Sequence, residues 1–432
     1  MNLARGSYAD VRVGQKAYLD APSFIVLLAA TFNALLAALN ANVASVSSGT
    51  AILAEVCLLG AAHFNALQRY RPEMATWYTL LGLVLIGFLA RTLATGEMEP
   101  KYLRDAAIIP TFIVLGLAAD RKCLDRTVFI LLAIVTMVGM IETLFPTTYA
   151  EIFNVLEYYI SSRDYAAEDF YTKDSALYVN AIRPDERVFH FLDIPRISSI
   201  FLEPVSLGNY CTIMTAYFCA RFSQLSSLAV LSGAAAITFL LVGCDGRLAV
   251  VSILLIIAAS ILVPTPPRLS AAVYLPLVIT GMVVVTLVMN PNPEADDFPG
   301  RIAYSIHLLN QFNLDHWLGI HRSQDDLDSG IAFFDSGIGY LVSTQSIIGL
   351  AVIWLFLACM GEEKTQEQIR YTHAILLYFA LTLTVSYSML TIKTAALAWF
   401  IYGVFQQSLC ATRKISGEGE ADCISTPRFV RT

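Results

Sequence analysis

Charged residues are scarce in this sequence, and long stretches lack them altogether. Asp, Glu, Lys and Arg make up 15% of the 432 residues, whereas hydrophobic residues make up 56% and the mean hydropathy is +0.61. A helix needs about 20 apolar residues to cross a hydrocarbon core roughly 30 Å thick. Uncharged runs that suit the centre of such a helix recur at 24–39, 76–90, 128–140 and 248–263. The scarcity of charge excludes a soluble protein and predicts a polytopic membrane protein.

Patterns that hold metals or form disulfides are also missing. The eight Cys and six His are scattered, no CxxC or HExxH spacing occurs, and neither long polar segment contains a cysteine. These absences predict no metal site, no cofactor and no disulfide framework. The net charge of −7 excludes nucleic acid as an expected partner.

The apolar runs predict an all-α polytopic protein, because backbone amides in a bilayer must be bonded within their own segment. We expect about twelve spans. Lys and Arg concentrate in alternate short turns, which by the positive-inside rule places both termini in the cytoplasm. The expected spans lie at 22–42, 49–67, 75–94, 105–119, 127–146, 204–222, 226–243, 247–264, 270–290, 337–360, 372–391 and 393–409.

These spans divide the chain into seven predicted parts. A cytoplasmic tail covers 1–21, the first five helices 22–146, and a large periplasmic loop 147–203. Helices six to nine fill 204–290, a second periplasmic loop covers 291–336, helices ten to twelve fill 337–409, and a disordered cytoplasmic tail covers 410–432. Loops longer than about 15 residues are usually functional or disordered. Their aromatic residues predict that both loops fold back onto the membrane domain, the first through an amphipathic helix at 149–162.

Chemically capable residues gather at the predicted outer membrane boundary. Arginine keeps its charge, and its planar fork matches phosphate oxygens, so several arginines there suit a diphosphate carried on a lipid. Each has a plainer interpretation as an interfacial anchor, a helix cap or a loop residue. The candidates are Arg196, Glu203, Arg247, Arg301, His321 and Asp335.

Three further charged residues lie in or near the spans. Glu55 falls within the second predicted span, where a carboxylate is costly and tends to be functional, and its partner is not evident. Arg91 and Lys393 lie near predicted span ends and are expected to reach the interface with their long side chains.

The order of these motifs resembles the Wzy-type polysaccharide polymerases, especially those that make exopolysaccharides of the xanthan kind. The resemblance covers most of the chain and rests on a large loop before an R…F-x-E-P…G segment, a Gly-Arg turn, and a second large loop ending in D-x-G. One departure is the R-x10-G pattern, because eleven residues separate Arg196 from Gly208. The matching residues are Arg196, Phe201, Glu203, Pro204, Gly208, Gly246, Arg247, Asp335 and Gly337.

The resemblance implies the multi-helix C-type glycosyltransferase fold in a bacterial inner membrane. It implies transfer of a growing glycan from polyprenyl diphosphate to the non-reducing end of one lipid-linked repeat unit, at the periplasmic face and without metal. A flippase and a chain-length regulator are the implied protein partners. The resemblance then implies that Arg196, Arg247 and Arg301 stabilise the leaving diphosphate. It implies that Glu203, Asp335 or His321 deprotonates the acceptor hydroxyl.

Two alternatives remain from the sequence. O-antigen ligases share the fold and the lipid donor, and their characteristic His could correspond to His316 or His321, although the surrounding pattern is not evident. A twelve-span secondary transporter would have two repeats, and the halves of this chain show no similarity.

Overall fold

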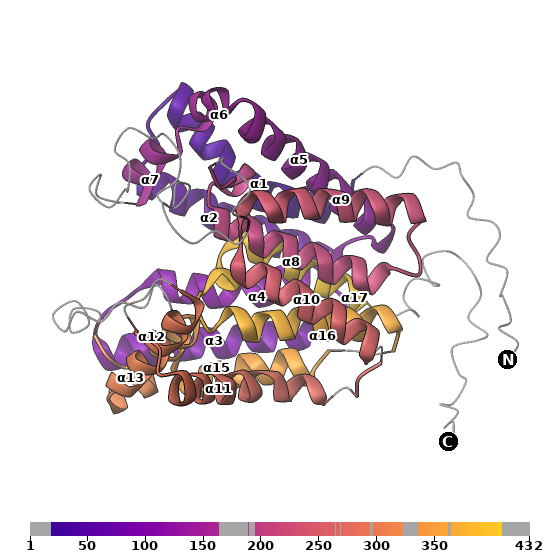
Figure 1. The fold of residues 1–432 in the computed structure, drawn as a ribbon. Coiled ribbons are helices and arrows are strands. Elements are labelled where there is room, and N and C mark those ends of the chain that lie inside the picture. Colours follow the sequence, from indigo (N-terminus) through magenta and orange to yellow (C-terminus); the bar gives the residue numbers. More distant parts are fainter. Residues whose placement is uncertain are drawn as a thin grey trace, which may run out of the picture.

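The computed structural model describes residues 19–163, 189, 195–263, 265–267, 269–293, 297–322, 336–361 and 364–407, and these residues form helices without strands. Figure 1 shows the bundle, with α6, α7, α12 and α13 at one end, here called the α7 end. Helix bounds are α1 Ala21–Asn42, α2 Ser48–Gln68, α3 Met74–Thr95, α4 Pro100–Ala118, α5 Leu124–Leu144, α6 Pro146–Phe153, α7 Val155–Arg163, α8 Pro204–Arg221, α9 Ser227–Cys244, α10 Arg247–Leu262, α11 Ser270–Met289, α12 Phe298–Gln311, α13 Leu314–Leu318, α15 Gly337–Cys359, α16 Gln366–Thr382 and α17 Ile392–Phe405.

The all-helical architecture is confirmed, and the described residues include seven helices long and apolar enough to cross a membrane. Those seven are α1, α2, α3, α5 together with the short helix η1 (Arg121–Cys123), α9, α11 and α15, and α10 and α17 are shorter apolar helices. A helix covers most of each range predicted to be a span. The chain is therefore a multi-pass membrane protein by the length and composition of its helices.

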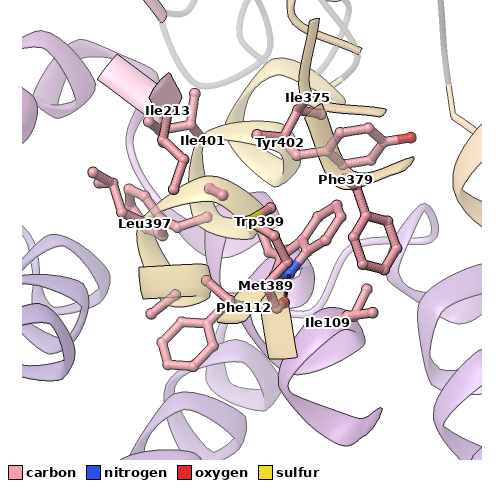
Figure 2. Packing of buried hydrophobic residues seen from close by; sticks show 14 of the residues in the cluster. Ile109, Phe112, Ile213, Ile375, Phe379, Met389, Leu397, Trp399, Ile401 and Tyr402 are labelled. Atoms are coloured by element: carbon pink, nitrogen blue, oxygen red, sulfur yellow. Dashed lines mark hydrogen bonds between the residues drawn. The ribbon is translucent and has the colours of Figure 1, made fainter. Parts of the chain in front are cut away.

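The centre of the bundle is α17, whose residues are buried throughout. It packs most extensively on α4, and each helix places a glycine at the crossing: a Cβ on Gly116 would lie 2.2 Å from the Phe400 carbonyl, and one on Gly403 2.1 Å from the Ile113 carbonyl. Close backbone approach through small residues is how membrane helices gain packing contacts. Figure 2 shows the cluster around Trp399, whose indole N–H donates to the Met389 carbonyl at 3.1 Å.

The outer helices carry apolar side chains on exposed faces. Leu231 on α9, Ile261 on α10 and Leu287 on α11 are 69%, 72% and 76% exposed. In water such surface would drive association. On a membrane protein these faces meet lipid, while α4, α8, α16 and α17 form the interior.

Two predicted helical segments differ from the structure. The amphipathic helix expected at 149–162 is two helices, α6 and α7, because Asn154 adopts a left-handed backbone with φ 34°. The span expected at 372–391 ends as α16 at Thr382. There Thr384 Oγ1 donates to the Leu381 carbonyl at 2.7 Å, and such side-chain bonds to the backbone compete with the helix.

The opposite end of the bundle is fastened by ion pairs. Arg221 contacts Asp125 at 2.7 Å and Glu367 at 3.0 Å, and Arg121 contacts the same Glu367 oxygen at 2.9 Å. Arg69 pairs with Asp20 at 3.4 Å. This end carries the basic turns that the positive-inside rule predicts to be cytoplasmic.

Candidate functional site

The segment that enters α8 is held in an unusual backbone conformation. Ser199 and Leu202 have φ values of 51° and 61°, the left-handed region that non-glycine residues rarely adopt. The carboxylate of Glu142 on α5 accepts from the backbone N–H of Ser198 at 2.8 Å and of Ser199 at 2.6 Å. Strained backbone persists only where its surroundings determine it, and it concentrates at functional sites.

Tyr149 supports the same segment from α6. Its hydroxyl donates to the Ser199 carbonyl at 2.8 Å, and the side chain is buried. Burial, with a smaller contribution from the charge of Glu142, raises the pKa of Tyr149 well above its ordinary value. The hydroxyl therefore stays protonated and remains a donor across the physiological pH range.

Arg196 organises the turn between α9 and α10. Its side chain is buried, Nε donates to the Cys244 carbonyl at 2.8 Å, and Nη2 donates to the Asp245 carbonyl at 3.4 Å. The backbone N–H of Ile197 donates to the Gly243 carbonyl at 3.0 Å, and Asp245 has φ 49°. The sequence places Arg196 and this turn far apart, and the structure brings them into direct contact.

Arg247 begins α10 immediately after this turn and is partly exposed. Gly246 lies against Gly208 of α8. A Cβ built on Gly246 would be 3.5 Å from the Gly208 Cα. The two glycines of the predicted motifs thus allow α8 and the α9–α10 turn to approach closely. Arg247 is consequently held near the start of α8.

Glu203 at the α7 end contacts three polar side chains. Its Oε2 pairs with Lys393 Nζ at 2.5 Å and accepts from Ser206 Oγ at 2.7 Å, while Oε1 accepts from the Tyr159 hydroxyl at 2.7 Å. The Lys393 side chain is 4% exposed and that of Glu203 is 19% exposed. An almost buried ammonium is thus compensated by a carboxylate that remains partly accessible.

The expectation that Lys393 reaches the interface is wrong. Lys393 lies in the first turn of α17, where the helix macrodipole disfavours a positive charge, and burial disfavours it further. The Glu203 carboxylate offsets both effects, so the ion pair fixes the start of α17 against the start of α8.

The segment between α16 and α17 extends this polar region. Asn209 Nδ2 on α8 donates to Ser388 Oγ at 2.7 Å, and the Tyr378 hydroxyl donates to Asn209 Oδ1. Ser388 lies in a short 3₁₀ helix, η4 (Ser388–Leu390). Its neighbour Tyr387 stacks on Tyr340 of α15, with ring centroids 4.4 Å apart. One segment therefore joins the Glu203 region to a second cluster.

The second cluster lies where α3, α4 and α15 meet. Arg104 pairs with Glu55, which identifies the missing partner of that intramembrane carboxylate, and also with Asp105 at 2.7 Å. The Tyr340 hydroxyl donates to Asp105 Oδ2 at 2.5 Å. Lys101 Nζ lies 5.7 Å from the centre of the Tyr340 ring.

Arg91 also belongs to this second cluster. It is 3% exposed, so the expectation that it reaches the interface is wrong as well. It lies 4.6 Å from the Tyr102 ring centre.

The described candidates His321 and Arg301 belong to other elements than Glu203. His321 is 4% exposed and stacks on His316 with centroids 4.6 Å apart, so its interpretation as a surface residue is wrong, and its carbonyl accepts from Arg91 at 3.2 Å. Arg301 lies on α12, which packs on α11 and α15. Asp335 lies outside the described residues.

Sequence reasoning missed Lys393, Tyr159 and Glu142 as members of the site. Lys393 and Glu142 carried a usable signal, since each is an ionisable residue at the end of an apolar run. Tyr159 carried none, because an aromatic residue on a helix is most often part of a core.

Comparison of the chain with protein-family models, with curated proteins and with solved structures finds no significant match. The function is therefore inferred from the residues and geometry described above.

Proposed function

We propose that the protein is a glycosyltransferase that polymerises polyprenyl-diphosphate-linked oligosaccharide repeat units at the periplasmic face of a bacterial inner membrane. The observation that carries the proposal is the Glu203–Lys393–Tyr159 centre, a partly accessible carboxylate at one end of a lipid-facing bundle. The segment 195–203 and the Cys244–Arg247 turn, which match the family's motifs in order, meet beside it.

The proposed reaction needs a proton acceptor and a stabilised leaving group. The acceptor hydroxyl attacks the anomeric carbon of the growing glycan, the bond from that carbon to the diphosphate oxygen breaks, and the hydroxyl proton passes to Glu203. Lys393, Ser206 and Tyr159 donate to the Glu203 carboxylate and orient it as the proton acceptor for the attacking hydroxyl. The polyprenyl diphosphate leaves with the bonding electrons.

The arginines divide into two roles under this proposal. Arg196 is a positioning residue, because its guanidinium already donates to the Cys244 and Asp245 carbonyls. Arg247, partly exposed after that turn, is the better placed cation for the leaving diphosphate. Arg301 would act only on a part of the lipid donor lying over α12.

The direct test is reconstitution. Purified protein in liposomes, supplied with lipid-linked repeat units and a metal chelator, is expected to extend them into polymer. Arg247→Ala is expected to lower the rate at least about 100-fold, the usual cost of losing a preorganised charge contact in the transition state, and Arg247→Lys is expected to restore it only in part. Arg69→Ala, at the opposite end, is the matched control and should retain full activity. A strict need for a nucleotide sugar would refute the proposal.

The same experiment separates the alternatives. A ligase would leave the units unextended and transfer glycan only when a lipid A core is added. A transporter would move the units across the membrane without changing their length. The product length, measured by gel or mass spectrometry, decides among the three.

The proposal also requires a defined topology, with twelve spans and both termini inside. Sandwich fusions of a phosphatase reporter near residue 315 are expected to be active, and those near residues 122 and 365 inactive. The expectation rests on basic residues such as Arg121, Lys122 and Lys364 at the turns near 122 and 365. An inactive fusion at 315 with an active one at 122 would place the Glu203 centre in the cytoplasm and exclude a periplasmic reaction.

A further inference from the structure

We propose that Arg91 is the anchor of a binding site for a phosphate group, separate from the Glu203–Lys393 centre. The site lies where the last turn of α3 meets the start of α4, the segment after α13 and the middle of α15. The inference goes beyond the proposed function and does not rest on it.

Arg91 is a buried cation with no counter-charge among the residues that the structure describes. Arg91 is 3% exposed, and no carboxylate of the described residues pairs with its guanidinium. Nη2 donates to the His321 carbonyl at 3.2 Å, but Nε and Nη1 are buried and have no hydrogen-bond acceptor among the residues that the structure describes. An arginine cannot shed its proton to avoid this cost, so an anion is the group that the described part of the site lacks.

The two carboxylates of the second cluster are already used. Glu55 and Asp105 both pair with Arg104, and Asp105 also accepts from the Tyr340 hydroxyl. The one described partner of the Arg91 guanidinium other than the His321 carbonyl is the Tyr102 ring, 4.6 Å from the guanidinium carbon. A cation over an aromatic face is attracted to it, but the ring carries no net negative charge and cannot neutralise the guanidinium.

A break in α15 next to Arg91 is the second, independent observation. Ser346, in the middle of this membrane-spanning helix, has φ 67° and ψ 164°, and its Oγ accepts from the Gly349 N–H at 3.1 Å, as a cap on a second half-helix would. Irregular backbone at membrane depth is tolerated where it lines protein or a polar site. Half-helix starts of this kind present N–H groups to anionic ligands.

Both partners of Arg91 connect it to this break. Gly319, two residues before His321, packs closely against the break in α15, since an added Cβ on Gly319 would lie 2.8 Å from the Ser346 N. On the other side, Gln345 Nε2 donates to the Tyr102 carbonyl at 2.8 Å. The buried guanidinium and the interrupted helix therefore form one local structure rather than two unrelated irregularities.

Phosphate is the anion that fits this arrangement. Arg91 lies one turn from the end of α3. The guanidinium fork matches two phosphate oxygens. Nε and Nη1, which have no acceptor among the described residues, are the donors available to the anion. The phosphate can be free diphosphate or the headgroup of a lipid, and the experiment separates these sources.

The first arm uses full-length protein purified in a maltoside detergent, which contains no phosphate. Pyrophosphate is expected to raise the thermal unfolding midpoint of the wild type by several degrees in a saturable manner, since a ligand that binds only the folded state stabilises it. Arg91→Gln should lose this response, while Arg69→Gln, an exposed arginine at the opposite end, should keep it.

The second arm replaces pyrophosphate with phosphatidylglycerol or with polyprenyl diphosphate, and detects bound lipid by native mass spectrometry. A response to either lipid that Arg91→Gln lacks supports the site and identifies the lipid source. A response to pyrophosphate alone supports it with a soluble ligand. No Arg91-dependent response to any of the three probes overturns it.

The stability of the variant without any anion is a further check. Removing an uncompensated buried charge should leave the unfolding midpoint of Arg91→Gln equal to or above that of the wild type in phosphate-free detergent. A marked loss of stability there would mean that Arg91 is a structural residue and would refute the site. Arg91→Lys is a second variant: it keeps the charge but loses the fork, and its pyrophosphate response is expected to be several-fold weaker than that of the wild type.

Discussion

Glu203→Gln is expected to abolish polymer formation and to destabilise the protein by about 3–5 kcal/mol, the usual cost of removing one partner of a buried ion pair. The amide keeps the shape of the side chain but neither accepts a proton nor neutralises Lys393, whose side chain is 4% exposed. Polymer yield in cells and the unfolding midpoint of the purified protein measure the two effects separately.

The double variant Glu203→Gln with Lys393→Met is the decisive control for that result. Removing both charges leaves no unpaired ion, so most of the lost stability should return, while polymer formation should not. Arg69→Gln breaks an exposed pair with Asp20 and should change stability by no more than about 1 kcal/mol. Full polymer yield from Glu203→Gln would remove this residue from the mechanism.

Gly403→Ala is expected to destabilise the protein by about 1–3 kcal/mol or more, through overpacking at the crossing of α4 and α17. The added Cβ would lie 2.1 Å from the Ile113 carbonyl, a backbone atom that cannot turn aside as a side chain can. Gly116→Ala should behave in the same way, since its Cβ would lie 2.2 Å from the Phe400 carbonyl. The fraction of protein surviving heating, measured by size-exclusion chromatography in detergent, reports the loss.

Glycines on the outer helices supply matched controls. An added Cβ at Gly60 on α2 or Gly87 on α3 would meet no atom within 4 Å. Alanine there is expected to leave stability unchanged or raise it by up to about 1 kcal/mol, because it reduces the freedom of the unfolded chain. Equal effects at Gly403 and Gly87 would show that the α4–α17 crossing is looser than the distances indicate.

The sequence by itself determined that the chain is helical and where its helices lie. Uncharged runs of sufficient length leave few alternatives in a bilayer, where every backbone amide must be bonded within its segment. The hydropathy pattern did not predict the helix ends at Asn154 and Thr382. These ends depend on single backbone conformations and on side-chain hydrogen bonds to the backbone, which hydropathy does not describe.

Only the tertiary structure decided which apolar helices are interior. The residues of α17 are buried throughout, whereas α11 carries Leu287 at 76% exposure, yet both helices are apolar over most of their length. Lipid and protein interior are equally apolar, so composition cannot distinguish a face that meets lipid from one that meets a helix.

The tertiary structure likewise decided which charges meet. Lys393 lies 234 positions from Tyr159, and the fold alone brings both to Glu203. The sequence around an arginine near a span end does not show whether its side chain reaches the interface or is buried among helices. In the structure Arg91 is buried. Charge at the membrane boundary is thus visible in the sequence, but its partner, or the lack of one, is fixed by helix packing.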